Sequence, residues 1–138
     1  MTNAPKYIHL KTHSAYSLLE GALPIAKIAK LAEAAGMPAI GLTDTSNLFG
    51  ALEFSEKLSG AGIQPICGAT YEIDFRDSVA PANALMRPGQ NEPAVRLAGP
   101  VALLAANPDG YANLIKLASQ AFLLPDPAEP PHIKIEAL

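Results

Sequence analysis

Residues 24–44 read PIAKIAKLAEAAGMPAIGLTD, and this stretch predicts a helix followed by a buried strand. Apolar side chains recur at helical spacing from Ile25 to Ala35, and Pro24 suits the first turn because its missing N–H is not needed there. Gly36 is the expected helix stop. Residues 39–43 are then short and nearly all apolar, as expected of a strand buried on both faces.

The alternation of strands and helices extends outward from this stretch. We expect further strands at residues 6–10, 63–75 and 101–106, and further helices that begin after Asn47 and Asn107, each capped by its asparagine. This order predicts an α/β fold with a mainly parallel sheet. A closed parallel barrel needs more units than these four strands. We therefore expect part of a barrel, with an open strand edge.

Two proline-rich stretches interrupt the pattern within residues 1–138. Residues 78–100 contain four prolines and two glycines, which predicts a mobile loop, with a short extended piece near residues 95–97. Residues 124–131 contain four more prolines, which indicates an extended linker. The length of 138 residues suits one domain or a piece of one.

Composition argues against a nucleic-acid surface in this chain. The 10 Lys and Arg against 13 Asp and Glu give a net charge of −3, and the residues up to Phe75 carry 5 basic and 7 acidic side chains against 5 and 6 after it. Neither half is basic, so a broad positive surface is not expected. Trp is absent, and four Tyr with four Phe offer few platforms for base stacking.

Cysteine content and the N-terminal residues bear on location. Cys67 is the single cysteine, so neither an internal disulfide nor a zinc site of several thiolates is expected. It lies in an apolar run, which favours a buried core thiol over a nucleophile. No signal peptide or membrane-length apolar run is visible. We expect a cytoplasmic location and no membrane partner.

Polar side chains gather where three of the predicted strands end or run, namely His9, His13, Ser14 and Glu20; Thr43, Asp44, Thr45, Ser46 and Asn47; and Thr70, Glu72 and Asp74. Active sites of parallel sheets lie at the carboxyl ends of strands. Imidazole and carboxylate groups in such a cluster could hold a divalent metal. The alternative is that His13 and Asp44 only hydrogen-bond loop backbone. Glycine-rich phosphate loops and a nucleophile elbow are absent.

Four blocks carry a resemblance to a known family: residues 7–22, 39–54, 62–68 and 103–117. Together they resemble the opening of the PHP (polymerase and histidinol phosphatase) domain of bacterial replicative DNA polymerase III alpha subunits. The resemblance implies the first half of a PHP domain, which is a distorted (β/α)7 barrel in this family. The polymerase palm and fingers are absent from these 138 residues.

The resemblance also implies a depleted metal site. Metal-binding members carry His-x-His, Asp-His, a later Glu and a later His; here those ligand positions hold Lys11, Thr45, Thr70 and Pro100, while His13, Glu20 (where Asp is usual) and Asp44 remain. An ammonium group has no lone pair to give. We therefore expect no catalytic residue, cofactor or metal in this chain. The parent polymerase would need Mg in its absent palm domain.

The implied parent is a DNA-directed DNA polymerase of bacterial chromosomal replication. Its partners would be the remainder of the alpha subunit, the proofreading exonuclease subunit, the polymerase III holoenzyme, and DNA through the absent parts. The expected role of this domain is a scaffold and a docking surface for the exonuclease. The alternatives are an active metal-dependent phosphoesterase or 3′–5′ proofreading nuclease, and a free-standing PHP-like protein unrelated to replication.

Overall fold

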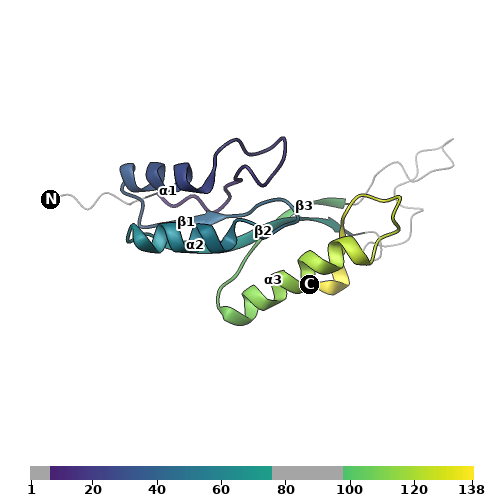
Figure 1. Cartoon of the computed structure of the whole chain (residues 1–138). Coiled ribbons are helices and arrows are strands. Elements are labelled where there is room, and N and C mark those ends of the chain that lie inside the picture. Colours follow the sequence, from purple (N-terminus) through teal and green to yellow (C-terminus); the bar gives the residue numbers. More distant parts are fainter. Residues whose placement is uncertain (1–6, 76–97) are drawn as a thin grey trace, which may run out of the picture.

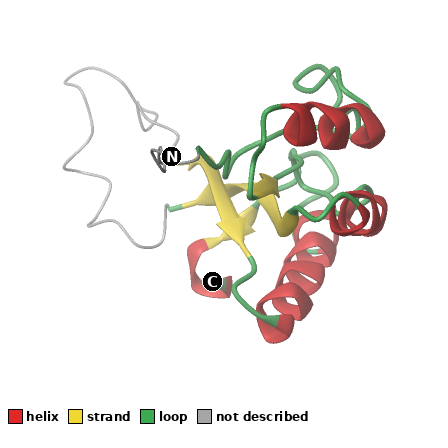
Figure 2. Cartoon of the chain, turned by 90° about the vertical axis from the view of Figure 1, so that its left-hand side faces the viewer, coloured by secondary structure: helices red, strands yellow, loops and turns green. Residues whose placement is uncertain are grey.

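The computed structural model describes residues 7–75 and 98–138. The chain order is α1 (Ile25–Ala34), β1 (Ala39–Leu42), α2 (Ala51–Gly60), β2 (Gln64–Asp74), β3 (Ala98–Leu104), α3 (Pro108–Leu123), β4 (Ile133–Lys134) and a short 3-10 turn, η3 (Ile135–Ala137). The three helices lie along one side of the strands, and α3 runs beside the distal end of β2 (Figures 1 and 2). The mixed α/β architecture that the sequence predicted is confirmed.

β2 is the central strand, and it changes partners along its length. Residues 64–67 pair in parallel with β1, whereas residues 68–74 pair in antiparallel with β3. Ile73 and Asp74 also pair in parallel with β4. The expectation of a mainly parallel sheet is therefore wrong for its longest pairing. Parallel neighbours need a long crossover, usually a helix, and the sequence between β2 and β3 carries no helical pattern.

The register of β3 fixes the direction of its backbone groups. Ala105 N–H donates to Cys67 O at 2.8 Å, so the bonded pairs fall at every second position from there. Pro100 lies opposite Glu72, at a non-bonded position, and its nitrogen faces away from β2. Within residues 7–75 and 98–138, no strand pairs with that outer edge of β3.

The structure differs from the sequence expectations for residues 98–100 and 101–106. Of the loop expected at residues 78–100, residues 78–97, with the extended piece near 95–97, lie outside the described part of the chain; Ala98 to Pro100 already belong to β3. The strand expected at residues 101–106 is real but not fully buried. Its side chains alternate between partly buried and exposed, as expected for an antiparallel strand covered on one face.

The first expected strand is also corrected. Lys6 lies outside the described residues, and residues 7–10 do not form a strand. The segment is nevertheless held beside β1, because Gly41 N–H donates to His9 O at 2.7 Å and Thr43 N–H donates to Thr12 O at 2.8 Å. Gly41 permits this approach, since a Cβ there would lie 2.6 Å from Leu10 O.

Helix boundaries follow local chemistry. Pro24 precedes α1, and Gly36, with φ +62°, follows its end as predicted. Asn107 caps α3 as predicted, because its side chain accepts from Gly110 N–H at 2.8 Å. Asn47 does not cap α2, which begins only at Ala51. Its Oδ1 accepts instead from Phe49 N–H at 3.2 Å, so it orders the loop before the helix.

Two apolar clusters divide the interior. The first joins α1 and α2 to β1 and comprises Ile25, Ile28, Ala29, Ala32, Ile40, Leu42, Phe54, Leu58 and Ile63. The second joins α3 to the distal half of β2 and to β4, and comprises Ala69, Tyr71, Ile73, Leu114, Leu117, Ala121 and Ile133. Tyr71 Oη donates to Leu114 O at 2.9 Å, and burial raises the pKa of Tyr71 to about 12.

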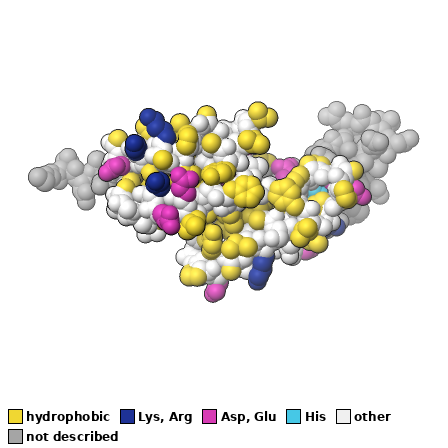
Figure 3. Space-filling model, viewed as in Figure 1, with side chains coloured by type: hydrophobic (Ala, Val, Ile, Leu, Met, Phe, Trp, Pro, Cys, Tyr) yellow, Lys and Arg dark blue, Asp and Glu magenta, His cyan; other side chains and the backbone are white. Residues whose placement is uncertain are grey.

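Large apolar side chains also remain on the surface. Figure 3 shows hydrophobic side chains gathered on the face where α2 and α3 lie. Phe49 and Leu52 are exposed at the start of α2, and Phe122 and Leu123 are exposed at the end of α3. Such groups are candidates for contact with other protein. None of the described helices is both long and apolar enough to cross a bilayer.

Candidate functional site

One cavity of about 670 Å³ gathers the positions singled out by the sequence. It is lined by Lys11, His13, Glu20, Thr45, Ser46, Thr70, Glu72, Pro100 and Pro131. All four positions where ligands were expected to be lost line it, and so do two of the three expected to remain. Asp44 is the exception, because it does not line this cavity.

The sheet brings these side chains together. Thr45 follows the carboxyl end of β1, and it forms an isolated parallel bridge with Thr70 of β2. Ser46 N–H donates to Thr70 O at 2.8 Å, and Thr70 N–H donates to Asp44 O at 3.0 Å. These bonds fix the loop after β1 against the middle of β2. Pro100 joins from β3, where it lies opposite Glu72.

Glu20 is the hub of one cavity wall. Thr45 Oγ1 donates to Glu20 Oε2, and His13 Nδ1 lies 2.8 Å from the same oxygen. His13 Nδ1 is buried, and its contact with Glu20 lacks the angles of a regular hydrogen bond. The pKa of Glu20 is lowered by the Thr45 hydrogen bond first, with burial opposing and then His13 and Lys11 adding to the lowering.

The two threonine hydroxyl groups of the cavity are already engaged. Thr45 Oγ1 donates to Glu20, as described above, and Thr70 Oγ1 donates to Thr43 O at 2.9 Å. A hydroxyl that donates its hydrogen to these partners still has lone pairs. As a metal ligand, however, a neutral hydroxyl is a poor substitute for imidazole or carboxylate. Pro100 has no side-chain donor atom at all. The cavity therefore holds one imidazole and two carboxylates beside an ammonium group.

Asp44 has a different task, beneath the cavity. Its carboxyl group is 1% exposed and accepts three hydrogen bonds, from Ser14 N–H at 2.7 Å, Ser14 Oγ at 2.7 Å and Ser17 Oγ at 2.6 Å. Ser17 Oγ in turn accepts from Thr45 N–H at 3.0 Å. Ser14 and Ser17 are also buried. This cluster fixes the turn that leads from His13 to Glu20.

The alternative that His13 and Asp44 only hydrogen-bond loop backbone agrees in part with Asp44 and does not agree with His13. Asp44 does bond the Ser14 backbone N–H, whereas His13 lies against the Glu20 side chain. Ser14 was among the residues chosen from sequence, but Ser17 was not. The signal available for Ser17 was its spacing of three from Ser14, which places both hydroxyls on the same side of a helical turn.

The other sequence candidates lie apart from this cavity. His9 is exposed, and its ring packs edge-on against Tyr7 at 4.6 Å between centroids. Asp74 is buried at the end of β2. Cys67, expected to be a buried core thiol, is only partly buried and lies 3.5 Å from Ser55 Oγ. Among the described residues, no group of three or more His, Cys, Asp and Glu side chains is placed to hold a metal ion.

The curated relatives named here share one name. The chain is 44% identical over 128 residues to the DNA polymerase III subunit alpha of Caulobacter vibrioides, which covers 90% of this chain and 10% of that protein. It is 37% identical over 134 residues to the subunit of the same name from Rickettsia felis, and 36% identical over 121 residues to that from Escherichia coli. These alignments cover 97% and 86% of this chain, and 10% and 9% of those proteins. The chain thus spans about a tenth of the length of these relatives.

Comparison with solved structures and family models completes the assignment. An amidohydrolase from Chromobacterium violaceum, described with bound SO4 and no metal, superposes with a TM-score of 0.51 at 20% identity, over 82% of this chain and 34% of that one. This likeness concerns the fold alone. The family model described as the PHP domain matches residues 9–138, so the chain belongs to the PHP domain family.

Proposed function

We propose that the chain is the N-terminal PHP region of a DNA polymerase III alpha subunit. The support is that curated relatives with this name match nearly the whole chain over about a tenth of their own length. On this proposal the parent protein is a DNA-directed DNA polymerase of the bacterial cytoplasm. It would need Mg in its palm domain, and it would complete the (β/α)7 barrel of which these strands form a part.

We propose further that the cavity has lost metal chemistry. The observation that carries this proposal is Lys11, which lines the same cavity as His13 and Glu20. Its ammonium group repels a cation and offers no lone pair. Three protein ligands are the usual minimum for a catalytic zinc ion. His13, Glu20 and Glu72 line the cavity, but no group of three such side chains among the described residues is placed to hold a metal ion. The hydroxyls of Thr45 and Thr70 are already bonded to other groups. The residues present do not fit a catalytic metal.

A domain without this chemistry would serve as scaffold and as a docking surface for the proofreading exonuclease subunit of the same holoenzyme. Two features support this role. Exposed apolar side chains at both ends of the helical face, among them Leu52 and Phe122, offer contact area to another protein. Residues 124–131 form turns without helix or strand, and most of their side chains are exposed.

Metal content tests the loss of chemistry. The full-length alpha subunit should leave gel filtration without stoichiometric zinc or manganese, and should not hydrolyse a phosphate ester at this domain. The combined variant Lys11→His, Thr45→His, Thr70→Glu and Pro100→His should bind metal more tightly than the parent. The matched control keeps Lys11 and carries the other three changes, and it should bind less tightly than the full set because the ammonium remains.

The opposite result would favour the alternative function. Stoichiometric metal in the unmodified subunit, with hydrolysis abolished by His13→Ala, would establish an active phosphoesterase or 3′–5′ nuclease. Docking is tested separately by cross-linking the full-length alpha subunit to its exonuclease. Cross-links should fall on this domain. If they all fall outside residues 1–138 and the rest of the barrel, the docking role fails and only the scaffold role is left.

A further inference from the structure

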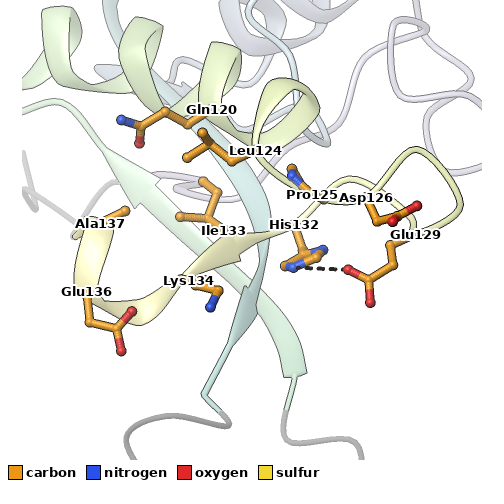
Figure 4. Close-up of a pocket in the computed structure, with 10 residues that line it drawn as sticks. All are labelled: Gln120, Leu124, Pro125, Asp126, Glu129, His132, Ile133, Lys134, Glu136 and Ala137. Carbon is orange, nitrogen blue, oxygen red and sulfur yellow. Dashed lines mark ion pairs between the residues drawn. The ribbon is translucent and has the colours of Figure 1, made fainter.

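A second cavity, of about 480 Å³, lies at the far end of α3 from its Asn107 cap. Figure 4 shows how it is built from the end of α3, the following loop, β4 and η3, with Leu124 and Ile133 pointing toward one another. Ile133 is 2% exposed and forms the apolar floor, while Leu124 overhangs it and is 73% exposed. No residue of this cavity belongs to the site described above.

The rim of this cavity is mainly acidic. Asp126 and Glu129 flank it on the loop side, and Glu136 lies on the opposite side (Figure 4). Among the described residues that line it, Lys134 is the one Lys or Arg. Asp126 Oδ1 accepts from Ala128 N–H at 2.9 Å, which orders the loop that carries both loop-side carboxylates. The charge of the rim is therefore complementary to a cationic partner.

His132 holds Glu129 only loosely. Its Nδ1 lies 3.0 Å from Pro130 O, and because a carbonyl can only accept, that nitrogen carries a proton and donates it to the carbonyl. The other ring nitrogen, Nε2, lies 3.8 Å from Glu129 Oε2, which is longer than a hydrogen bond. The Glu129 side chain is 41% exposed, so a cationic group of a partner can reach its carboxylate.

The end of α3 adds to the same preference. This helix has 16 residues and no basic side chain in its last turn. The last carbonyl groups of a helix carry partial negative charge, and cations near them are favourable. Gln120 and Leu124, from the last turn and the residue after it, line the cavity. The rim carboxylates and the helix end therefore act in the same direction, above an apolar floor.

We propose that this cavity binds a segment of a partner protein in which a large apolar side chain stands next to Lys or Arg. The apolar side chain enters between Leu124 and Ile133, and the cationic group meets Asp126 and Glu129. The proposal rests on the docking role proposed above, and it names the chemistry of the segment that docks.

The test is an NMR titration of the whole 138-residue chain, labelled with ¹⁵N. The probe is the peptide acetyl-Gly-Phe-Arg-Gly-amide. Two matched peptides replace its Arg by Glu or its Phe by Ser. The Phe-Arg peptide should give saturable shifts confined to residues 120–137, and each control should bind about ten-fold more weakly or worse. Added salt should weaken binding of the Phe-Arg peptide.

Variants sharpen the assignment. The double change Asp126→Asn and Glu129→Gln should weaken the Phe-Arg peptide about ten-fold, since charge-assisted contacts are lost. The control Glu56→Gln, an acidic residue of α2 outside this cavity, should leave binding unchanged. Both variants change exposed residues, so the chain should keep its fold, which the spectrum itself reports.

Three results would overturn the proposal. They are the absence of saturable shifts, equal binding of the Glu-containing peptide, and shifts at residues 120–137 that grow with protein concentration in the absence of peptide. The last would show a second copy of the chain as the occupant. Cross-links that place the exonuclease elsewhere, with the titration successful, would remove the docking role and leave the cavity assignment standing. A failed titration with cross-links on another face of this domain would do the reverse.

Discussion

Two carboxylate groups near the same cavity differ in their exposure to solvent and in their hydrogen bonds. Asp44, beneath the cavity, is 1% exposed and accepts three hydrogen bonds from Ser14 and Ser17. The Glu20 side chain, on the cavity wall, is 49% exposed and meets a hydroxyl and an imidazole. The difference teaches that resemblance to a metal-site motif does not assign a role. Asp44 shapes the turn, whereas Glu20 contributes one of the charged groups of the cavity.

The largest effect should come from removing the buried carboxylate. Asp44→Ala leaves three buried donors without their acceptor, and we expect it to lower the free energy of unfolding by about 3 to 5 kcal/mol. Urea denaturation of the whole chain measures this. If the alanine variant does not fold, Asp44→Asn serves instead, with an expected loss of about 1 to 3 kcal/mol because one acceptor oxygen is kept. A loss below about 0.5 kcal/mol for both variants would break the comparison.

An intermediate effect on stability should come from Tyr71, which is buried like Asp44 but carries no charge. Tyr71 is fully buried, and its hydroxyl is neutral and donates to Leu114 O. Tyr71→Phe should cost about 1 kcal/mol, since one buried hydrogen bond is lost and the carbonyl is left without this donor. Urea denaturation at neutral pH gives the value. A loss as large as that of Asp44→Ala would mean that charge matters little in the comparison.

The same tyrosine also predicts a pH dependence. Burial raises the pKa of Tyr71 to about 12 from the ordinary 10, so the native state holds the phenolic proton more tightly than the unfolded chain. The resulting stability is fully present below pH 10 and is lost as the pH rises from 10 toward 12. The parent should therefore lose stability more steeply than Tyr71→Phe across this range. Parallel curves would contradict the burial of the hydroxyl.

The smallest effect should come from the cavity wall. Glu20→Gln removes a charge that is half exposed, so the free energy of unfolding at neutral pH should change little. The lowered pKa of Glu20 adds a sign: its stabilisation is present above the usual value of 4.5 and is lost as the pH falls through the folded value. The parent should approach the variant in stability below pH 4.5. If Glu20→Gln and Asp44→Asn lower the free energy of unfolding equally at neutral pH, the distinction between the exposed and the buried carboxylate is wrong.

Sequence reasoning reached the elements whose signals are local. The Asn107-Pro108 cap, the Gly36 stop and the limits of β2 each depend on a few neighbouring residues, and each was predicted within a residue or so. It did not reach the antiparallel direction of β3. That direction depends on pairing across a long intervening segment whose pattern is weak. The family motifs, by contrast, led directly to the cavity positions.

The role of Asp44 lay beyond such reasoning for a geometric reason. In extended backbone, successive side chains point to opposite sides. Thr45 faces the cavity, so its neighbour Asp44 points away from it, toward Ser14 and Ser17. A motif shows that two residues are adjacent in the chain, but not which of them faces the open side. Only the placement of the turn at residues 14–17 decides that.

Pro100 has a consequence for the behaviour of the chain at high concentration. An open strand edge is a template for pairing with another molecule, and such pairing leads to sheet aggregates. The Pro100 nitrogen faces this edge of β3 and carries no hydrogen, so a docking strand would meet a gap in the middle of the row. Pro100 therefore interrupts the row of donors that an added strand would need along this edge.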